Sequence, residues 1–203
     1  MTILALDCSF TGLALALQNG AHTHVFGTST PRSSDVLPTE IAELFVKSAT
    51  SAAALSRILV TTGPGSFTGI RLGLATAEAF KLIYPHIEII GLSTLHALAR
   101  QVVATHHPEQ PFTLMLDAAG GQTYQQTFSA TGNPLSPAVC EPLNPSPSTL
   151  HPTFFQSSLM LASPAVALEA LDASHLFTLA EDPTNHLPAT PVYLKPLTYK
   201  QVS

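Results

Sequence analysis

Two stretches far apart in the chain share one pattern. Residues 3–17 read ILALDCSFTGLALAL, and residues 113–128 read TLMLDAAGGQTYQQTF. Each is an apolar run that ends in an aspartate, followed by small residues with a glycine and then by a second strand-like run. The alternative is a coincidence between two ordinary hairpins. If the repeat is real, the chain holds a duplicated lobe, and we expect Asp7 and Asp117 to face each other across a cleft.

The repeat predicts an α/β protein of two lobes, which is the ground plan of the actin-like, sugar-kinase-like ATPases. Each lobe is expected to follow the order β-β-β-α-β-α. The first, with the partner-docking helices discussed below, spans residues 1–108, and a smaller second lobe spans 109–203. The second lobe must be trimmed, because few residues remain for it and its segment 142–152, PLNPSPSTLHP, is a Pro/Ser-rich connector.

Hydrophobic periodicity places the elements of the first lobe. The turn Asn19-Gly20 favours a hairpin and predicts a three-stranded meander at the start of the chain. An amphipathic helix follows, because Leu37, Ile41, Leu44 and Phe45 recur at helical spacing. Further predicted elements are a strand over 57–62, a helix over 66–83, a strand over 87–93, a helix over 95–104, and a short strand and helix within 157–171.

Composition limits the class of protein. Apolar residues make up 45% and charged residues 10%, which provides ample material for a buried core. The formal charge of −5 lacks the basic excess with which proteins grip nucleic acid, so the chain is a poor candidate for binding it alone. Cys8 and Cys140 have no metal-ligand or redox spacing and are expected to be reduced thiols. With no signal-peptide pattern and no membrane-length apolar run, we expect a soluble cytoplasmic protein.

The glycine-rich stretch 63–73, GPGSFTGIRLG, follows a predicted buried strand. It lacks the lysine of a Walker A loop, and its glycines do not have the Rossmann spacing. A glycine-rich turn that leads into a helix still aims backbone N–H groups outward, and Ser66 or Thr68 would cap that helix. The candidate residues for binding a nucleotide or another anion are Asp7, Gly63, Gly65, Ser66 and Asp117.

Gly69, Gly73 and Ala77 form a strip of small residues along the same predicted helix. Glycine inside a helix costs about 0.5–1 kcal/mol relative to alanine, so two on one face need a reason. The strip either packs on the protein's own helix around 37–48 or lets another subunit approach. Arg71 would then lie at the edge of such a contact, pair with an acid or remain solvated.

Catalytic patterns are mostly missing. The nine histidines show no H-x-x-x-H or H-E-x-x-H spacing, there is no C-x-x-C, and no metal site is predicted. There is also no G-x-S-x-G nucleophile motif. Asp7 and Asp117 would serve as general acids or as ligands of magnesium-bound water if the cleft is real, or they simply close turns at the strand ends.

Five segments together resemble the bacterial TsaB (YeaZ) family: ILALDCS, GPGSFTGIRLGLATAEAF, IGLSTLHALA, LDAAGGQTY and PVYLKP. The resemblance covers roughly the first 125 residues and returns at 191–196. It implies the two-lobed fold and a subunit of the machinery that makes threonylcarbamoyladenosine next to the anticodon of tRNA. Members often carry a histidine before the first helix; here the local sequence is PRSSDVLP, so no role of that histidine carries over.

The resemblance further implies a non-catalytic subunit without a cofactor, which binds and activates a TsaD-type catalytic paralogue. It acts with a TsaE-type ATPase, meets tRNA only within the complex, and can form a homodimer when alone, although the sequence leaves open whether the free chain is a monomer or a homodimer. The expected partner interface comprises Leu37, Ile41, Leu44, Phe45, Phe67, Gly69, Ile70, Arg71, Gly73 and Ala77. The alternatives are a self-sufficient nucleotide-binding ATPase or transferase of the actin-like superfamily and, less favoured, a metallopeptidase (glycoprotease).

Overall fold

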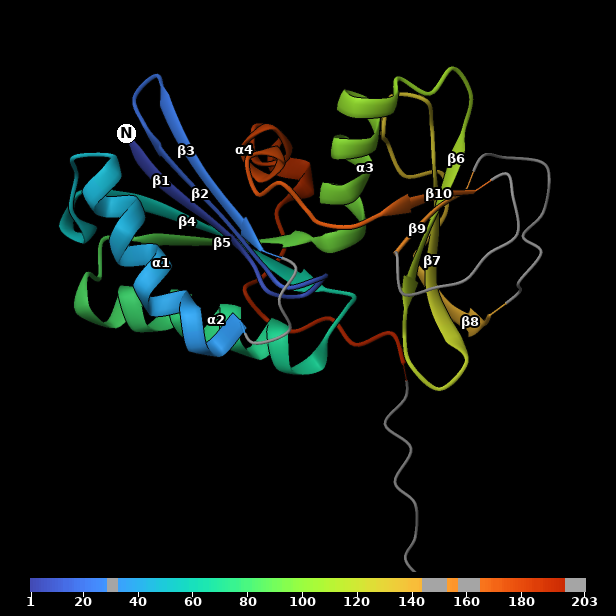
Figure 1. Ribbon diagram of the computed structural model, residues 1–203, viewed down its shortest axis with the longest axis horizontal. Coiled ribbons are helices and arrows are strands. Elements are labelled where there is room, and N and C mark those ends of the chain that lie inside the picture. The colour runs from blue at the N-terminus through green and yellow to red at the C-terminus, as the bar shows by residue number, and fades with distance from the viewer. Residues whose placement is uncertain (29–32, 144–152, 157–164, 196–203) are drawn as a thin grey trace, which may run out of the picture.

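The computed structural model describes residues 1–28, 33–143, 153–156 and 165–195, which form two lobes side by side (Figure 1). The first lobe contains a five-stranded sheet in the order β3-β2-β1-β4-β5. β1, β2 and β3 pair antiparallel with one another, whereas β4 and β5 run parallel to β1. Its strands are β1 (Thr2–Asp7), β2 (Leu13–Asn19), β3 (His22–Thr28), β4 (Leu55–Gly63) and β5 (Glu88–Ser93).

The second sheet repeats the first. Its order is β10-β9-β6-β7-β8, with β6, β7 and β8 antiparallel and β9 and β10 parallel to β6. Asp7 ends the central strand β1, and Asp117 ends its counterpart β6. The predicted duplication and the actin-like, sugar-kinase-like two-lobed fold are therefore confirmed. The strands are β6 (Phe112–Asp117), β7 (Gln122–Phe128), β8 (Val139–Pro142), β9 (Thr153–Gln156) and β10 (Ala165–Leu168).

Within the described residues, the longer helices belong to the first half of the chain. α1 (Ser33–Lys47) joins β3 to β4, α2 (Phe67–Ile83) joins β4 to β5, and α3 (Thr94–His106) follows β5. A short 3-10 turn (Ala52–Ala54) precedes β4. The matching connections of the second lobe contain residues 144–152 and 157–164, which lie outside the described residues. The helix predicted at the end of 157–171 is wrong over Ala165–Leu168, because this segment pairs with β9 as a strand.

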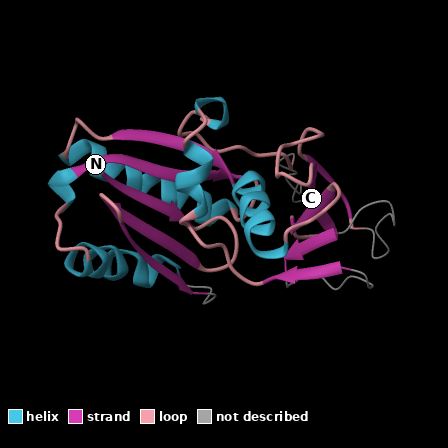
Figure 2. Ribbon diagram, turned by 90° about the horizontal axis from the view of Figure 1, so that it is seen from above, coloured by secondary structure: helices cyan, strands magenta, loops and turns pink. Residues whose placement is uncertain are grey.

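The two faces of the first sheet build two cores. Leucines that alternate along β1 and β2, such as Leu4 and Leu15, are fully buried beneath α1 and α2. The intervening residues are mostly small, such as Ala5 and Ala16, and they face α3 and the second lobe. Figure 2 shows α3 lying between the two sheets. The small side chains let α3 approach the sheet closely, so one core continues from the first lobe into the second.

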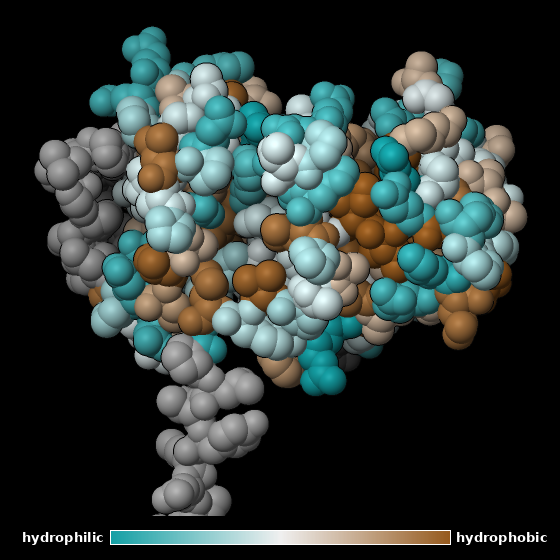
Figure 3. Space-filling model, turned by 180° about the vertical axis from the view of Figure 1, so that it is seen from behind, coloured by the Kyte–Doolittle hydropathy of each residue, from teal (hydrophilic) through white to brown (hydrophobic). Residues whose placement is uncertain are grey.

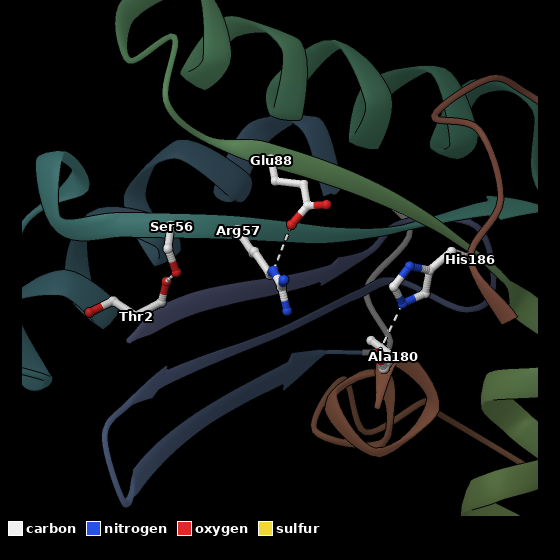
Figure 4. A network of polar contacts seen from close by, with 6 residues as sticks. All are labelled: Thr2, Ser56, Arg57, Glu88, Ala180 and His186. Atoms are coloured by element: carbon white, nitrogen blue, oxygen red, sulfur yellow. Dashed lines mark hydrogen bonds and ion pairs between the residues drawn. The ribbon is translucent and has the colours of Figure 1, made fainter. Parts of the chain in front are cut away.

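The chain returns to the first lobe after β10. α4 (His175–Ala180) packs on α3 and on the first sheet rather than on the second. His186 Nε2 lies 2.9 Å from the carbonyl oxygen of Ala180 and closes the turn that follows α4 (Figure 4). Nearby, the Nε of Arg57 on β4 donates to Glu88 of β5 at 2.6 Å. The end of the described chain, within the segment 109–203 predicted as the second lobe, thus returns to the first sheet.

The N-terminus of α2 rests directly on the end of β1. Ser66 Oγ accepts a hydrogen bond from Gly69 N at 3.2 Å, which confirms the predicted N-cap. The backbone N–H of Ser66 donates to Ser9 O at 2.7 Å. A Cβ atom at Gly65 would lie 2.2 Å from Ser9 O, and one at Gly69 would lie 1.7 Å from Cys8 O. These two glycines are required because backbone touches backbone.

Among the described residues, no helix combines the length and apolar character needed to cross a membrane.

We predict that Gly69→Ala destabilises the fold by about 3 kcal/mol, because the new methyl group would overlap a backbone carbonyl that cannot move aside. Thr68→Ala, at an exposed position of the same helix turn, is the control and should change stability by less than about 0.5 kcal/mol. Urea unfolding of both variants measures the difference. Equal stability of Gly69→Ala and the parent would contradict the close contact.

His96 provides a pH test of the core between the lobes. Its ring is 8% exposed and lies 5.9 Å from the Phe128 ring. Burial, followed by the nearby charge of Arg100, lowers its pKa to about 4. The unfolded chain therefore binds the proton more tightly. The stability contribution of this group is constant above about pH 6.5 and falls as the pH drops toward 4.

We expect the free energy of unfolding to fall by on the order of 2 kcal/mol from this group between pH 6.5 and pH 4. The measurement compares urea unfolding of the parent with that of His96→Leu at pH 7, 5.5 and 4.5. Because other titrating groups are common to both proteins, the difference between the two curves isolates His96. A difference that stays constant over this range would show that His96 is not held neutral.

Candidate functional site

Asp7 is a structural residue at the end of β1. Its side chain is 1% exposed, and Oδ1 accepts hydrogen bonds from Ser9 N at 3.0 Å, Ser9 Oγ at 2.5 Å and Thr61 Oγ1 at 2.5 Å. Oδ2 accepts from Phe10 N at 3.3 Å. Asp7 does not line the cleft between the lobes. The expectation that it faces Asp117 across that cleft is wrong, because Asp7 closes the turn after its strand.

Cys8, the neighbour of Asp7, is a buried free thiol. Burial, followed by the charge of Asp7, raises its pKa well above the ordinary range. A thiol held in the protonated form is a poor nucleophile, so Cys8 serves packing rather than chemistry.

The cleft between the lobes has a volume of about 490 Å³. Of the residues predicted to bind a nucleotide or anion, Gly65, Ser66 and Asp117 line it. Gly63 is buried beneath Val192, whose carbonyl oxygen would lie 2.8 Å from a Cβ at position 63. Sequence reasoning did not assign the other lining residues to this cleft, and these include Tyr124, Gln156, Tyr193 and Lys195. Tyr124 lies in the motif LDAAGGQTY, and Tyr193 and Lys195 lie in the closing motif PVYLKP, but neither motif suggested a role for them.

The polar groups of the cleft bind mainly to the protein itself. Lys195 Nζ donates to the carbonyl oxygens of Ala118 at 2.9 Å and Ala119 at 2.8 Å. Asp117 is exposed, and its Oδ1 accepts from Ala119 N at 2.7 Å. The backbone N–H of Asp117 donates a hydrogen bond to Gln156 Oε1 at 3.0 Å. Among the described residues that line it, the cleft therefore offers the carboxylate of Asp117 and the ammonium group of Lys195, with no second acid.

The described part of the chain contains no cluster of side chains suited to binding a metal ion. There, no three His, Cys, Asp or Glu side chains lie close enough together to hold an ion. The predicted pair of Asp7 and Asp117 does not form, because only Asp117 reaches the cleft.

Most residues predicted to contact a partner lie inside the first lobe. Gly73 packs on the sheet, where a Cβ would lie 3.3 Å from Val60 Cγ2 and 3.7 Å from Leu6. The proposal that a partner helix approaches along Gly69 and Gly73 is therefore wrong, and so is the alternative that this strip packs on α1. The buried members of the predicted interface are Leu37, Ile41, Leu44, Gly69, Ile70, Gly73 and Ala77.

An apolar groove of about 410 Å³ runs between α1 and α2. Phe45 of α1 and Phe80 of α2 are partly buried, and their ring centroids are 6.2 Å apart across it. The groove is lined by Ser34, Leu37, Pro38, Ile41, Ala42, Phe45, Ala52, Leu72, Thr76 and Phe80. Leu37, Ile41 and Phe45 of the predicted interface thus meet here, but as the walls of a groove rather than as a flat helix face.

Exposed apolar side chains continue beyond this groove. Val46 at the end of α1 is 80% exposed, and Leu82 and Ile83 at the end of α2 are 85% and 68% exposed. At the other end of α2, Phe67 is 45% exposed, and the Arg71 guanidinium lies 5.3 Å above its ring. Hydrophobic patches also reach the surface on the rear face of the molecule (Figure 3). Exposed apolar groups of this kind mark surfaces that contact other molecules.

The sequence is similar to one described protein family and to several proteins. Residues 28–145 match the family model described as TsaD: tRNA N6-adenosine threonylcarbamoyltransferase. The tRNA threonylcarbamoyladenosine biosynthesis protein TsaB of Escherichia coli K12 is 31% identical over 135 residues, which are 66% of this chain and 57% of that protein. The tRNA N6-adenosine threonylcarbamoyltransferase of Bartonella bacilliformis is 31% identical over 99 residues, covering 49% of this chain and 27% of that protein.

Solved structures share the fold over nearly the whole chain. YeaZ from Pseudomonas aeruginosa superposes with a TM-score of 0.77 at 19% identity, covering 95% of this chain and all of that one. A second Pseudomonas aeruginosa structure, titled as similar to peptidase YEAZ, gives a TM-score of 0.78 at 20% identity, covering 96% and 99%. In sequence, by contrast, the chain spans only about half the length of the TsaB relatives it matches.

We predict that Asp7→Asn lowers the free energy of unfolding by about 2 kcal/mol, because the new amide group would leave a buried donor without an acceptor. Asp117→Asn is the matched control from the duplicated position. It should change stability by less than about 0.5 kcal/mol, since this residue is exposed. Urea unfolding at pH 7 measures both. Equal effects of the two substitutions would contradict the structural role of Asp7.

Proposed function

We propose that this chain acts in tRNA threonylcarbamoyladenosine biosynthesis. It belongs to the family whose model, described as TsaD, matches residues 28–145, and TsaB (YeaZ) proteins are among its relatives. In this proposal it is a non-catalytic subunit that binds and activates a TsaD-type catalytic subunit. The observation that supports the proposal is the burial of the Asp7 carboxylate and its internal hydrogen bonding. The acid at the end of the first central strand is committed to internal hydrogen bonds and is unavailable to a substrate.

The groove between α1 and α2 is the proposed docking surface. It is apolar, it is open, and its aromatic walls resemble the centres of protein interfaces, where buried aromatic side chains carry much of the binding energy. Val46 near the end of α1 and Leu82 and Ile83 at the end of α2 are further exposed apolar side chains on the two helices that form the groove. A helix of the catalytic subunit would lay its apolar face into this groove. When the chain is alone, a second copy would use the same surface and form a homodimer.

The remaining partners follow from charge. A formal charge of −5 disfavours independent binding to tRNA, so the catalytic subunit and other components would supply the tRNA contacts. A TsaE-type ATPase completes the proposed assembly, which would work in the cytoplasm.

One observation favours a second candidate function. The cleft of about 490 Å³ contains Lys195, Asp117 and the cap residue Ser66, so it has room and polar groups for a nucleotide. In that case the chain would be a self-sufficient ATPase or transferase. Titration calorimetry with magnesium-ATP separates the candidates, since tight binding by the isolated chain supports the enzyme and no binding at millimolar nucleotide supports the partner subunit.

The proposed function predicts that threonylcarbamoyladenosine forms only when the catalytic subunit is present. The measurement is threonylcarbamoyladenosine formation on tRNA by the cognate TsaD-type and TsaE-type proteins and the enzyme that supplies the carbamoyl adenylate. The chain is tested present, absent and without the catalytic subunit. Product formed by the chain without its catalytic partner would contradict the non-catalytic role, and equal product in its absence would contradict activation.

Ala42→Glu tests the docking surface. Ala42 lies on the exposed rim of the groove, so the charge should leave the fold intact and weaken co-purification with the catalytic subunit about tenfold or more. Ala21→Glu in the exposed turn between β2 and β3 is the same substitution away from the groove and should behave as the parent. Unchanged co-purification of Ala42→Glu would show that the partner binds elsewhere.

A further inference from the structure

The last described segment of the chain, from residue 187 onward, binds to the first lobe before it reaches the second. After the 3-10 turn Pro183–Asn185, Leu187 exchanges two backbone hydrogen bonds with Gly91 of β5, at 2.8 and 3.0 Å. Val192 N then donates to Thr62 O of β4 at 2.8 Å. A Cβ at Gly91 would lie 2.5 Å from Pro188 O, so this segment lies directly on the sheet. The residues from 187 to 192 are therefore fixed to the carboxyl ends of β5 and β4.

The same segment then reaches the second lobe. The Tyr193 ring stacks on Phe67 at the start of α2, with centroids 5.1 Å apart. Two residues later, Lys195 Nζ donates to the carbonyl oxygens of Ala118 and Ala119 in the turn between β6 and β7. Figure 1 shows this red segment running from beneath the first lobe toward the second. An ammonium group on two carbonyl oxygens makes charge-assisted hydrogen bonds, which are stronger than neutral ones.

We propose that residues 190–195 form a strap that sets the angle between the two lobes, with the Lys195 ammonium as its cross-link to the second lobe. The strap lies at the cleft, where Tyr193 and Lys195 line the wall. On α3 the lobes are joined separately, by Arg100 Nη1 to Thr131 O at 3.1 Å and by Gln101 Nε2 to Ala170 O at 2.9 Å. Contacts on α3 leave a hinge, and the strap holds the cleft side against opening about that hinge.

The strap distinguishes this chain from two-lobed proteins that close around a ligand. There the ligand bridges the lobes and the angle between them depends on its presence. Here the bridging cation belongs to the chain, so the angle is set without a ligand. The inference goes beyond the proposed function, because it concerns the rigidity of the isolated chain and holds for either candidate activity. It also explains the closing motif PVYLKP, in which the tyrosine and the lysine are the two contact residues.

Distances between spin labels on the two lobes test the strap. Cysteines replace exposed Ala21 in the turn between β2 and β3 and exposed Val139 on β8, in a background with Cys140→Ser. Buried Cys8 stays unlabelled. Pulsed electron paramagnetic resonance then gives the distribution of distances for the full chain, with and without magnesium-ATP. We expect a single narrow distribution in the labelled parent that magnesium-ATP leaves unchanged.

Lys195→Met keeps the length of the side chain but removes its charge and donors. We expect its distribution to broaden and extend to longer distances, while Lys81→Met, the same change at an exposed lysine of α2, leaves the distribution narrow. Tyr193→Leu, which removes the ring stack but keeps Lys195, should broaden it less. Circular dichroism melting shows whether each variant is folded. If Lys195→Met does not fold, the distribution measured for Tyr193→Leu tests the strap in its place.

Two results would overturn the strap. One is an unchanged narrow distribution in folded Lys195→Met, or in Tyr193→Leu if the lysine variant is unfolded. The other is a broad distribution in the parent that narrows only with magnesium-ATP, which would assign closure to a ligand. Neither result bears on tRNA modification, so failure of the strap and failure of the proposed function are distinguishable.

Discussion

The contact between the end of β1 and the start of α2 determines much of the first lobe. Ser66 N donates to Ser9 O at 2.7 Å, and Gly69 lies so close to Cys8 O that no side chain fits between them. This contact encloses Asp7 behind the loop and presses one face of α2 onto the sheet. The opposite face of α2 is then left exposed, and with α1 it borders the apolar groove. The glycine-rich loop at the start of 63–73, whose sequence suggests phosphate binding, here packs the start of α2 closely against the end of β1.

The division of the first sheet into a leucine face and an alanine face explains how the lobes are joined. Leucines such as Leu4, Leu6 and Leu15 fill the space beneath α1 and α2. Ala5 and Ala16 face the other way and leave room for α3, which then contacts Phe112 and Phe128 of the second lobe within one core. Because this core spans both lobes, their association does not depend on a flexible linker. The cleft opposite α3 is the place where the lobes could separate, and the strap lies there.

Sequence reasoning recovered the strands of the first lobe and the duplicated pair β6 and β7, because both depend on local patterns, whereas it missed β8 and β9 and predicted a helix at β10. Alternating apolar residues and the turn at Asn19-Gly20 define the meander, and the repeated strand ending in Asp7 or Asp117 identifies the second lobe. The packing partner of the strip Gly69, Gly73 and Ala77 could not be predicted. Gly69 and Gly73 indicate that another segment approaches closely, but they do not identify that segment. The same limit applies to Tyr193 and Lys195. Their partners Phe67 and Ala118 are distant in sequence, and no periodicity links them.

The two copies of the strand-end aspartate lie in turns with different surroundings. In the first lobe, the 17-residue α2 connects β4 to β5, and its N-terminal loop covers the turn that contains Asp7. Asp117 of the second lobe is exposed, and the carbonyl groups of the next two residues, Ala118 and Ala119, accept hydrogen bonds from Lys195. Where the loop before α2 contacts the turn after β1, the strap thus contacts the turn after β6.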